Sequence, residues 1–499
     1  MLKISDKKSL ILNLIYTGLF AVITICFVIR HEIWADEAQA WLIVQNLGFI
    51  DLFKHLVNEG HPSLFYLLIM PFAKLKLPIF FMQILCWLST CFSVFLLWQF
   101  APFQKTTKLA ITLSAGFLYF FPVIARSYSL LPLLLFLTAI LYQDKNKHPI
   151  FYSILLVLIA NTHVIMFCFA FLLGLFFVIE NIKEKQKVFL PATIIFMGLT
   201  AVVLQLWGTE NSNSMINFST QDIFRSAIVV PIQFFVNAVD FNNSILFEIQ
   251  KLPFANVAYF PYIFVFLILY INLCIGLWGY DKKIFALNSF SVIFQLFIYV
   301  FAYSALMYPS RIFCAFLITI FCWWIALDKS KKENKKTKLF STKVVNSLIA
   351  IFFAMSCFNG INYAYKDFVG NYSSAKETAE FIQKNIPENA ILIPTEDGCS
   401  LGIYYYLPSR NFWSIRRKTF IKYMKWVKED NDVYEDYYFT KILEYNVQKY
   451  KLKNVYILSS DFMNLHHFEE KIPSKYELVF SSSKALSLGE SFKVYKFKG

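Results

Sequence analysis

The chain has 499 residues, of which 57% are hydrophobic and only 16% are charged, and its formal net charge is +14. An average soluble protein is roughly 45–50% apolar and about 25% charged, so this composition excludes a disordered chain, a coiled coil and an ordinary cytosolic enzyme. Long apolar runs separated by short lysine-rich tracts indicate an integral membrane protein. Basic loops beside membrane spans set the orientation of the chain, so the positive charge does not indicate nucleic acid as a partner.

The apolar runs can be counted in chain order. Residues 9–29 form a run too long for a signal peptide, which predicts an uncleaved first helix that starts in the cytoplasm. Residues 62–75 are apolar but short, as is typical of a re-entrant or interfacial segment. If every lysine-rich tract is cytoplasmic, about eleven crossings result, and the C-terminus lies outside. After the first helix they are 79–100, 109–121, 130–142, two short passes within 149–180 broken at 161–163, 188–207, 259–280, 285–306, 309–327 and 344–358.

Residues 367–499 have the pattern of a small α/β domain rather than of a membrane segment. Ser374 and Glu377 have the spacing of a capping box, which predicts a helix that begins there. Strand-like runs follow at 390–394, 454–458, 477–480 and 492–497. The expected fold class is therefore a polytopic all-α membrane domain over residues 1–366, followed by an extracytoplasmic α/β domain over 367–499. Residues 31–78 form the first outer loop.

Outside the lysine-rich tracts, the ionisable residues at the ends of the predicted spans fall on the outer face. They are Asp36, Glu37, His61, Arg126, His163 and Arg311, with Tyr128 beside them. Ionisable groups at the edge of hydrocarbon are costly, so they are retained most readily where they face one another or a polar cavity. A phosphate needs cations to balance its charge, and a hydroxyl nucleophile needs a base to take its proton. The set therefore predicts a site for an anion and a proton transfer.

Three of these segments resemble the motifs of one enzyme family. Residues 34–41, which include Asp36 and Glu37, are similar to the acidic first-loop motif of GT-C glycosyltransferases. Residues 60–68 resemble the His-Pro-Pro segment of the branch that contains the protein O-mannosyltransferases and the aminoarabinose transferases (glycosyltransferase family 39), with Ser63 in place of the second proline. Residues 125–131 resemble the Arg-x-Tyr turn of that branch.

The resemblance implies a GT-C fold and an activity. A sugar would move from a polyprenyl-phosphate donor to a hydroxyl of a cell-envelope lipid, glycan or protein at the outer face of a bacterial inner membrane. Asp36 is expected to act as general base, and Glu37 to orient it or to hold a sugar hydroxyl. Arg126, Arg311, His61, His163 and Tyr128 are expected beside the donor phosphate. No Asp-x-Asp motif stands in the outer loops, so the sequence predicts no metal site, although a divalent cation such as Mg or Mn stays open.

Two alternatives remain at this point. An O-antigen polymerase or ligase is also polytopic with Arg and His at the outer face, but its large central outer loop fits poorly beside an acidic first loop. A lipid or sugar transporter would favour broken helices or charged residues at mid-span, and mainly His163 supports it.

Overall fold

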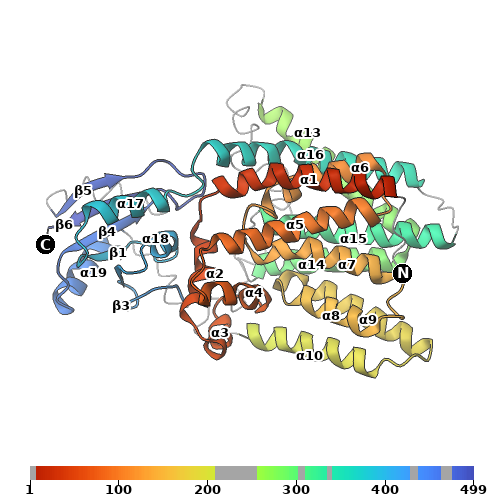
Figure 1. Ribbon diagram of the computed structural model, residues 1–499, viewed down its shortest axis with the longest axis horizontal. Helices are drawn as coiled ribbons and strands as arrows, with labels where there is room; N and C mark the ends of the chain where they lie inside the picture. Colours follow the sequence, from red (N-terminus) through yellow and green to blue (C-terminus); the bar gives the residue numbers. More distant parts are fainter. Residues whose placement is uncertain are drawn as a thin grey trace.

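The computed structural model describes residues 7–207, 255–301, 309–333, 340–426, 436–461 and 475–498. It has an elongated shape, with a bundle of helices at one end and a smaller part built around a β-sheet at the other (Figure 1). The helices of the bundle and of the loop after its first helix are α1 (Lys7–Arg30), α2 (Ala35–Asn46), α3 (Phe49–Leu56), α4 (Leu64–Lys74), α5 (Phe80–Phe100), α6 (Lys105–Leu113), α7 (Leu131–Tyr142), α8 (Pro149–Ala160), α9 (Phe167–Lys183), α10 (Phe189–Leu206), α13 (Ala255–Tyr280), α14 (Lys282–Phe301), α15 (Pro309–Glu333) and α16 (Thr342–Val369).

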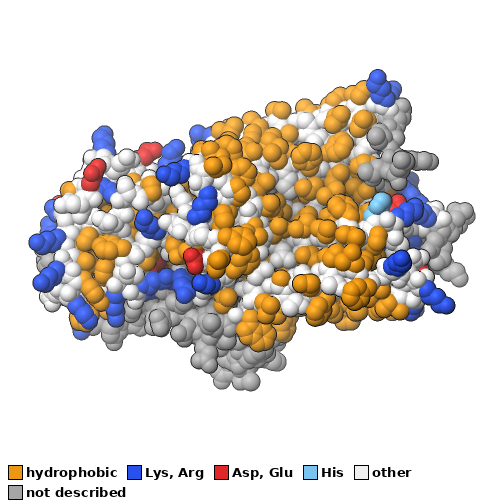
Figure 2. Space-filling view, turned by 60° about the horizontal axis from the view of Figure 1, so that its bottom comes forward, with side chains coloured by type: hydrophobic (Ala, Val, Ile, Leu, Met, Phe, Trp, Pro, Cys, Tyr) orange, Lys and Arg blue, Asp and Glu red, His pale blue; other side chains and the backbone are white. Residues whose placement is uncertain are grey.

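The bundle has the dimensions and surface of a membrane domain. Among the described residues, seven helices are long and apolar enough to cross a bilayer: Lys7–Arg30, Phe80–Phe100, Val164–Lys183, Phe189–Leu206, Ile263–Tyr280, Ser310–Lys332 and Thr342–Val369. Each coincides with one of the predicted crossings. Three shorter apolar helices accompany them, at Leu64–Lys74, Ser127–Tyr142 and Pro149–Ala160. Hydrophobic side chains cover the outside of the bundle, while charged side chains gather toward the ends of the molecule (Figure 2). The predicted polytopic helical domain is confirmed.

Two of the apolar runs contain a break in the helix. The break expected at 161–163 is present, because α8 ends at Ala160 and a short 3-10 turn (Val164–Met166) precedes α9. The run 109–121 is not one helix: α6 ends at Leu113, and a separate π-helical turn spans Gly116–Phe120. Irregular turns of this kind are frequent at functional sites, because they point side chains in directions that a regular helix does not allow.

The lysine-rich tracts meet at one end of the bundle. Glu180 pairs with Lys145 at 3.1 Å and with Lys283 at 3.7 Å, and Lys329 pairs with Asp281 at 2.6 Å. Tracts that are more than a hundred residues apart in sequence therefore lie on the same side, as the even number of crossings between them requires. The sheet lies at the opposite end of the molecule (Figure 1).

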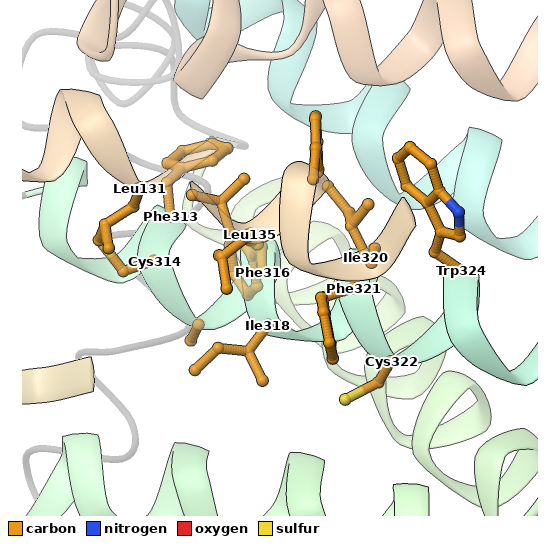
Figure 3. Close-up of a cluster of buried hydrophobic side chains, with 14 of the residues drawn as sticks. Leu131, Leu135, Phe313, Cys314, Phe316, Ile318, Ile320, Phe321, Cys322 and Trp324 are labelled. Atoms are coloured by element: carbon orange, nitrogen blue, oxygen red, sulfur yellow. The ribbon is translucent and has the colours of Figure 1, made fainter. Parts of the chain in front are cut away.

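Helix α15 runs through the middle of the bundle, and its membrane-spanning window is entirely buried. Figure 3 shows side chains of α15 from Phe313 to Trp324 in the buried core, with Leu131 and Leu135 of α7 near its first turns. Because other helices surround α15, Arg311 in its first turn lies inside the protein, with only 7% of its surface exposed.

The C-terminal part is a six-stranded mixed sheet with helices packed on it, which confirms the predicted small α/β domain. The strand order is β3-β2-β1-β4-β6-β5. The strands are β1 (Ile391–Pro394), β2 (Asn411–Ser414), β3 (Thr419–Phe420), β4 (Val455–Ser460), β5 (Tyr476–Ser481) and β6 (Phe492–Phe497), and the helices are α17 (Ala375–Asn385), α18 (Leu401–Tyr406) and α19 (Asp436–Lys449). Strands β2, β1 and β4 are parallel, while β6 is antiparallel to both β4 and β5.

The expected capping box is only half right. Helix α17 does follow Ser374, but the Ser374 hydroxyl donates to the carbonyl of Ser483 at 2.8 Å and does not cap the helix. The Glu377 carboxylate accepts from the amide and the hydroxyl of Ser483. Tertiary contacts with the loop before β6 have replaced the local hydrogen bonds.

Candidate functional site

The acidic motif forms the first turn of α2, directly after the chain leaves α1. Helix α2 begins at Ala35, and the Glu37 side chain reaches back to accept from the Trp34 amide at 3.4 Å. The Ala35 amide donates to the carboxylate of Glu490, in the loop before β6, at 2.9 Å. The free amides at the start of a helix need hydrogen-bond acceptors, and here Glu37 of the same turn and Glu490 from the far end of the sequence supply them.

A cavity at this helix start collects residues from four parts of the chain. Its lining consists of Trp34, Asp36, Phe120, Ile124, Arg126, Tyr128, Ser310, Arg311 and Tyr372. Four residues that the sequence predicts for the site are therefore brought to one place: Asp36, Arg126, Tyr128 and Arg311. They come from α2, from the turn after the π-helix and from the first turn of α15.

Arg126 and Asp36 are in direct contact across this cavity. One guanidinium nitrogen of Arg126 lies 3.4 Å from the Asp36 carboxylate, and another donates to the Asp36 backbone carbonyl. Burial lowers the pKa of Arg126, but the charge of Asp36, together with smaller contributions from Tyr128, Tyr66 and Glu59, offsets burial and raises this pKa above its ordinary value. The guanidinium is thus permanently charged. Asp36 keeps about a third of its side chain (32%) exposed, and Arg126 keeps 10%.

Glu37 has a different environment from its neighbour Asp36, since it is completely buried and does not line the cavity. Its carboxylate accepts from the Ala125 amide at 2.5 Å and lies 3.1 Å from the imidazole of His31. The other nitrogen of His31 lies 2.7 Å from Asp367, which also accepts from the Tyr119 hydroxyl. This placement suits a residue that positions the helix start and the Arg126 turn, rather than one that holds a sugar hydroxyl.

His31 is the centre of this buried network. Burial lowers the pKa of His31, but the carboxylates of Asp367 and Glu37 more than offset burial and raise the pKa to about 10. The imidazole is therefore charged at neutral pH. The sequence analysis did not select His31, because a single histidine after a helix carries no local signal for two partners of which one is 336 residues away.

His61 and His163 pack against each other beside the cavity, with ring centroids 4.9 Å apart and nearly perpendicular planes. Burial, together with the charges of Arg126 and Arg311, lowers the pKa of His61 to about 3. Its Nδ1 donates to the Glu59 carbonyl at 2.7 Å. His61 is thus neutral, and it supplies no positive charge for a phosphate. Neither histidine is among the residues that line the cavity.

Within the described parts of the chain, no group of three or more His, Cys, Asp or Glu side chains is arranged to hold a metal ion. The possible divalent cation stays a prediction.

Sequence reasoning missed three aromatic residues of the cavity, which are Trp34, Phe120 and Tyr372. Trp34 begins the motif at 34–41, in which only the acidic pair was selected for the site. Tyr372 follows α16 in a connection that carries no recognisable motif.

The comparisons with known proteins give likenesses to solved structures. No family model matches the chain, and no curated protein matches it. The crystal structure of ArnT from Cupriavidus metallidurans in the apo state aligns with 96% of this chain and 97% of its own, at 12% sequence identity and a TM-score of 0.48.

Proposed function

We propose that this chain is a multi-pass membrane glycosyltransferase that moves a sugar from a polyprenyl-phosphate donor to a hydroxyl acceptor. The observation that carries the proposal is the single cavity that holds a carboxylate, Asp36, together with two guanidinium groups, Arg126 and Arg311. The cavity lies at the end of the bundle away from the lysine-rich tracts. By the positive-inside rule this end faces outward, with the N-terminus of the chain in the cytoplasm of a bacterial cell.

The reaction requires few groups from the protein. The leaving group is a phosphate monoester anion, which needs charge balance more than it needs a proton, and two buried guanidinium groups can provide that balance. Asp36 accepts the proton of the acceptor hydroxyl as that hydroxyl attacks the anomeric carbon. A single displacement of this kind inverts the anomeric centre. Glu37 serves as a positioning residue, because it bonds to the chain directly before Arg126 and belongs to the same helical turn as Asp36.

Asp36→Asn is the first test. A general base contributes about 100- to 10,000-fold to the rate, so this variant should lose at least about 100-fold in transfer from radiolabelled polyprenyl-phosphate sugars to a membrane extract. Asp51→Asn is the matched control, because Asp51 lies on the adjacent helix α3 with 63% of its side chain exposed.

The proposal would be wrong if Asp36→Asn kept its turnover at a normal protein level. Release of free polyprenyl phosphate without any labelled product would indicate a hydrolase instead. Retention of the anomeric configuration in the product would contradict the single displacement.

A further inference from the structure

The apolar and aromatic residues that line the cavity differ in their chemistry. Phe120 and Ile124 have no hydrogen-bonding group in their side chains, and both belong to the buried hydrophobic core of the bundle. Trp34 and Tyr372 each combine an aromatic ring with a polar N–H or O–H group, and they lie where α1 and α16 end and the chain passes into the outer loop and the α/β part. The rings of Trp34 and Tyr372 lie edge to face, with centroids 6.0 Å apart.

The proposed donor has a fixed order of parts: an apolar chain, a phosphate and a sugar. The apolar chain stays in the hydrocarbon, while the phosphate and the sugar enter the cavity at the end of the bundle. The phosphate is drawn to the guanidinium groups of Arg126 and Arg311. Within the same lining, Trp34 and Tyr372 offer a sugar both ring faces and polar groups. Asp36, the proposed base, lines the cavity beside them.

We infer that Trp34 and Tyr372 form the sugar-binding wall of the active site and contact the donor's sugar ring directly. This inference rests on the proposed function and assigns the sugar subsite within it. The C–H groups on the face of a sugar ring carry a slight positive charge, and the faces of aromatic rings carry a negative quadrupole, so the two attract each other. The indole N–H and the phenol hydroxyl are polar groups that can serve the sugar hydroxyls.

The α/β part holds one half of this wall in place. The Ser487 amide donates to the carbonyl of Tyr372 at 3.0 Å, and the Leu486 amide donates to that of Asn371 at 2.9 Å. On its other side, the Tyr372 ring packs on the imidazole of His31, with centroids 4.7 Å apart. The loop before β6 therefore sets the position of a residue that contacts substrate, and it gives the C-terminal part a share in sugar selection.

The test compares two ligands of the full-length protein in detergent: undecaprenyl phosphate, and the same lipid carrying mannose or glucose. We expect Trp34→Ala and Tyr372→Ala each to weaken binding of the sugar-loaded lipid by about 3- to 10-fold, the range that an aromatic contact contributes. The affinity for undecaprenyl phosphate without sugar should change by less than about 2-fold, which is smaller than the loss of a direct contact would cause. Retained binding of the sugar-free lipid also shows that the variant is folded.

Trp34→Phe and Tyr372→Phe keep the ring faces and should restore most of the lost affinity. Trp41→Phe is the matched control, because Trp41 stands in the same helix but is buried away from the cavity. Equal losses of affinity for both lipids would overturn the inference, since the two residues would then serve the phosphate or the fold. Unchanged binding of the sugar-loaded lipids would overturn it as well. If the unaltered protein bound neither lipid, the proposed function itself would fail, which is a distinct result.

Discussion

At the scale of single residues, the contact between Arg126 and Asp36 joins the proposed phosphate site to the proposed base. The guanidinium lies 3.4 Å from the Asp36 carboxylate, so each charge offsets the other. A donor phosphate that bound Arg126 would compete with Asp36 for the same N–H groups. Arrival of the donor would thus free the carboxylate for the acceptor hydroxyl, which would couple donor binding to activation of the base.

This argument predicts that the two arginines act on donor binding. A hydrogen bond to a charged group contributes about 1.5–3 kcal/mol, so Arg126→Ala and Arg311→Ala should each weaken binding of undecaprenyl phosphate by roughly 10- to 100-fold. The matched control is Arg30→Ala, because Arg30 is exposed at the end of α1 and bonds only weakly, at 3.4 Å, to the Phe368 carbonyl. Unchanged donor affinity in both cavity variants would exclude a phosphate site between the two residues.

The sequence could place the acidic pair at the outer face, but it could not predict which of the two residues faces the cavity. Successive residues of an α-helix point about 100° apart, so Asp36 and Glu37 necessarily face different surroundings. Which of the two faces the cavity depends on how α2 packs, and that is fixed by remote partners such as Ala125, Asp367 and Glu490. The two histidines show the same limit, since burial, with a smaller contribution from arginines of other segments, lowers the pKa of both.

At the scale of secondary-structure elements, the long apolar helices could be predicted because hydrocarbon thickness imposes their length. The π-helical turn at Gly116–Phe120 and the short strands β2 and β3 were missed. A turn of five residues and strands of two to four residues carry too few side chains to produce a period. These short elements form where larger elements pack together, and they include the turn that supplies Phe120 to the cavity.

Helix α16 makes an unusually close approach to the chain between α6 and the π-helical turn. A Cβ atom added at Gly360 would lie 2.6 Å from the Cα of Ala115 and 3.1 Å from its amide nitrogen. Small residues allow membrane helices to approach this closely, and the contact gains dispersion energy along both elements. It also sets the distance between Tyr119 and Asp367, whose hydrogen bond of 2.8 Å supports the His31 network.

We therefore expect Gly360→Ala to destabilise the protein by about 1–3 kcal/mol, as overpacked cores generally do. The change should lower the thermal unfolding midpoint in detergent and reduce transfer activity together. Gly18→Ala is the matched control, because nothing lies within 4 Å of an added Cβ at that exposed position of α1. If Gly360→Ala unfolded at the same temperature as Gly18→Ala, the close packing of α16 would have no energetic importance.

At the scale of the whole molecule, the α/β part is fastened to the helix that carries the proposed base. The Gln39 amide exchanges two hydrogen bonds with the backbone of Met424, at 2.7 and 3.0 Å. Glu490 bonds to the Ala35 amide and accepts from the Ser373 hydroxyl at 2.6 Å. The C-terminal part thus holds α2 at Ala35 and at Gln39. The contacts that dock this part are therefore also contacts that position the proposed site.

This docking should depend on pH through Glu490, which is buried at 2% exposure. Burial raises its pKa, and so do the charges of Asp36 and Glu37, while the bonds from Ser373 and Ala35 lower it; the result is a pKa of about 8 against 4.5 for an unperturbed glutamate. Between these two values the folded protein binds a proton that the unfolded chain has released. Stability that depends on Glu490 is therefore fully present below about pH 4.5 and is lost as the pH rises through about 8.

His31 acts in the same direction over a higher range, because its pKa is raised from 6.5 to about 10. Thermal unfolding of the full chain in detergent, followed at several pH values between 5 and about 9, should show a falling midpoint for the unaltered protein. Glu490→Gln retains an acceptor for the Ala35 amide and carries no charge, so we expect a clearly flatter profile up to about pH 8, with only the His31 contribution remaining above about pH 6.5. Glu477→Gln is the control, because Glu477 is a half-exposed residue of β5 that pairs with Lys498 at the surface, and its profile should match the unaltered one. An identical slope for Glu490→Gln and the unaltered protein would show that Glu490 does not carry the pH dependence and that Gln39 and the remaining contacts alone dock the C-terminal part.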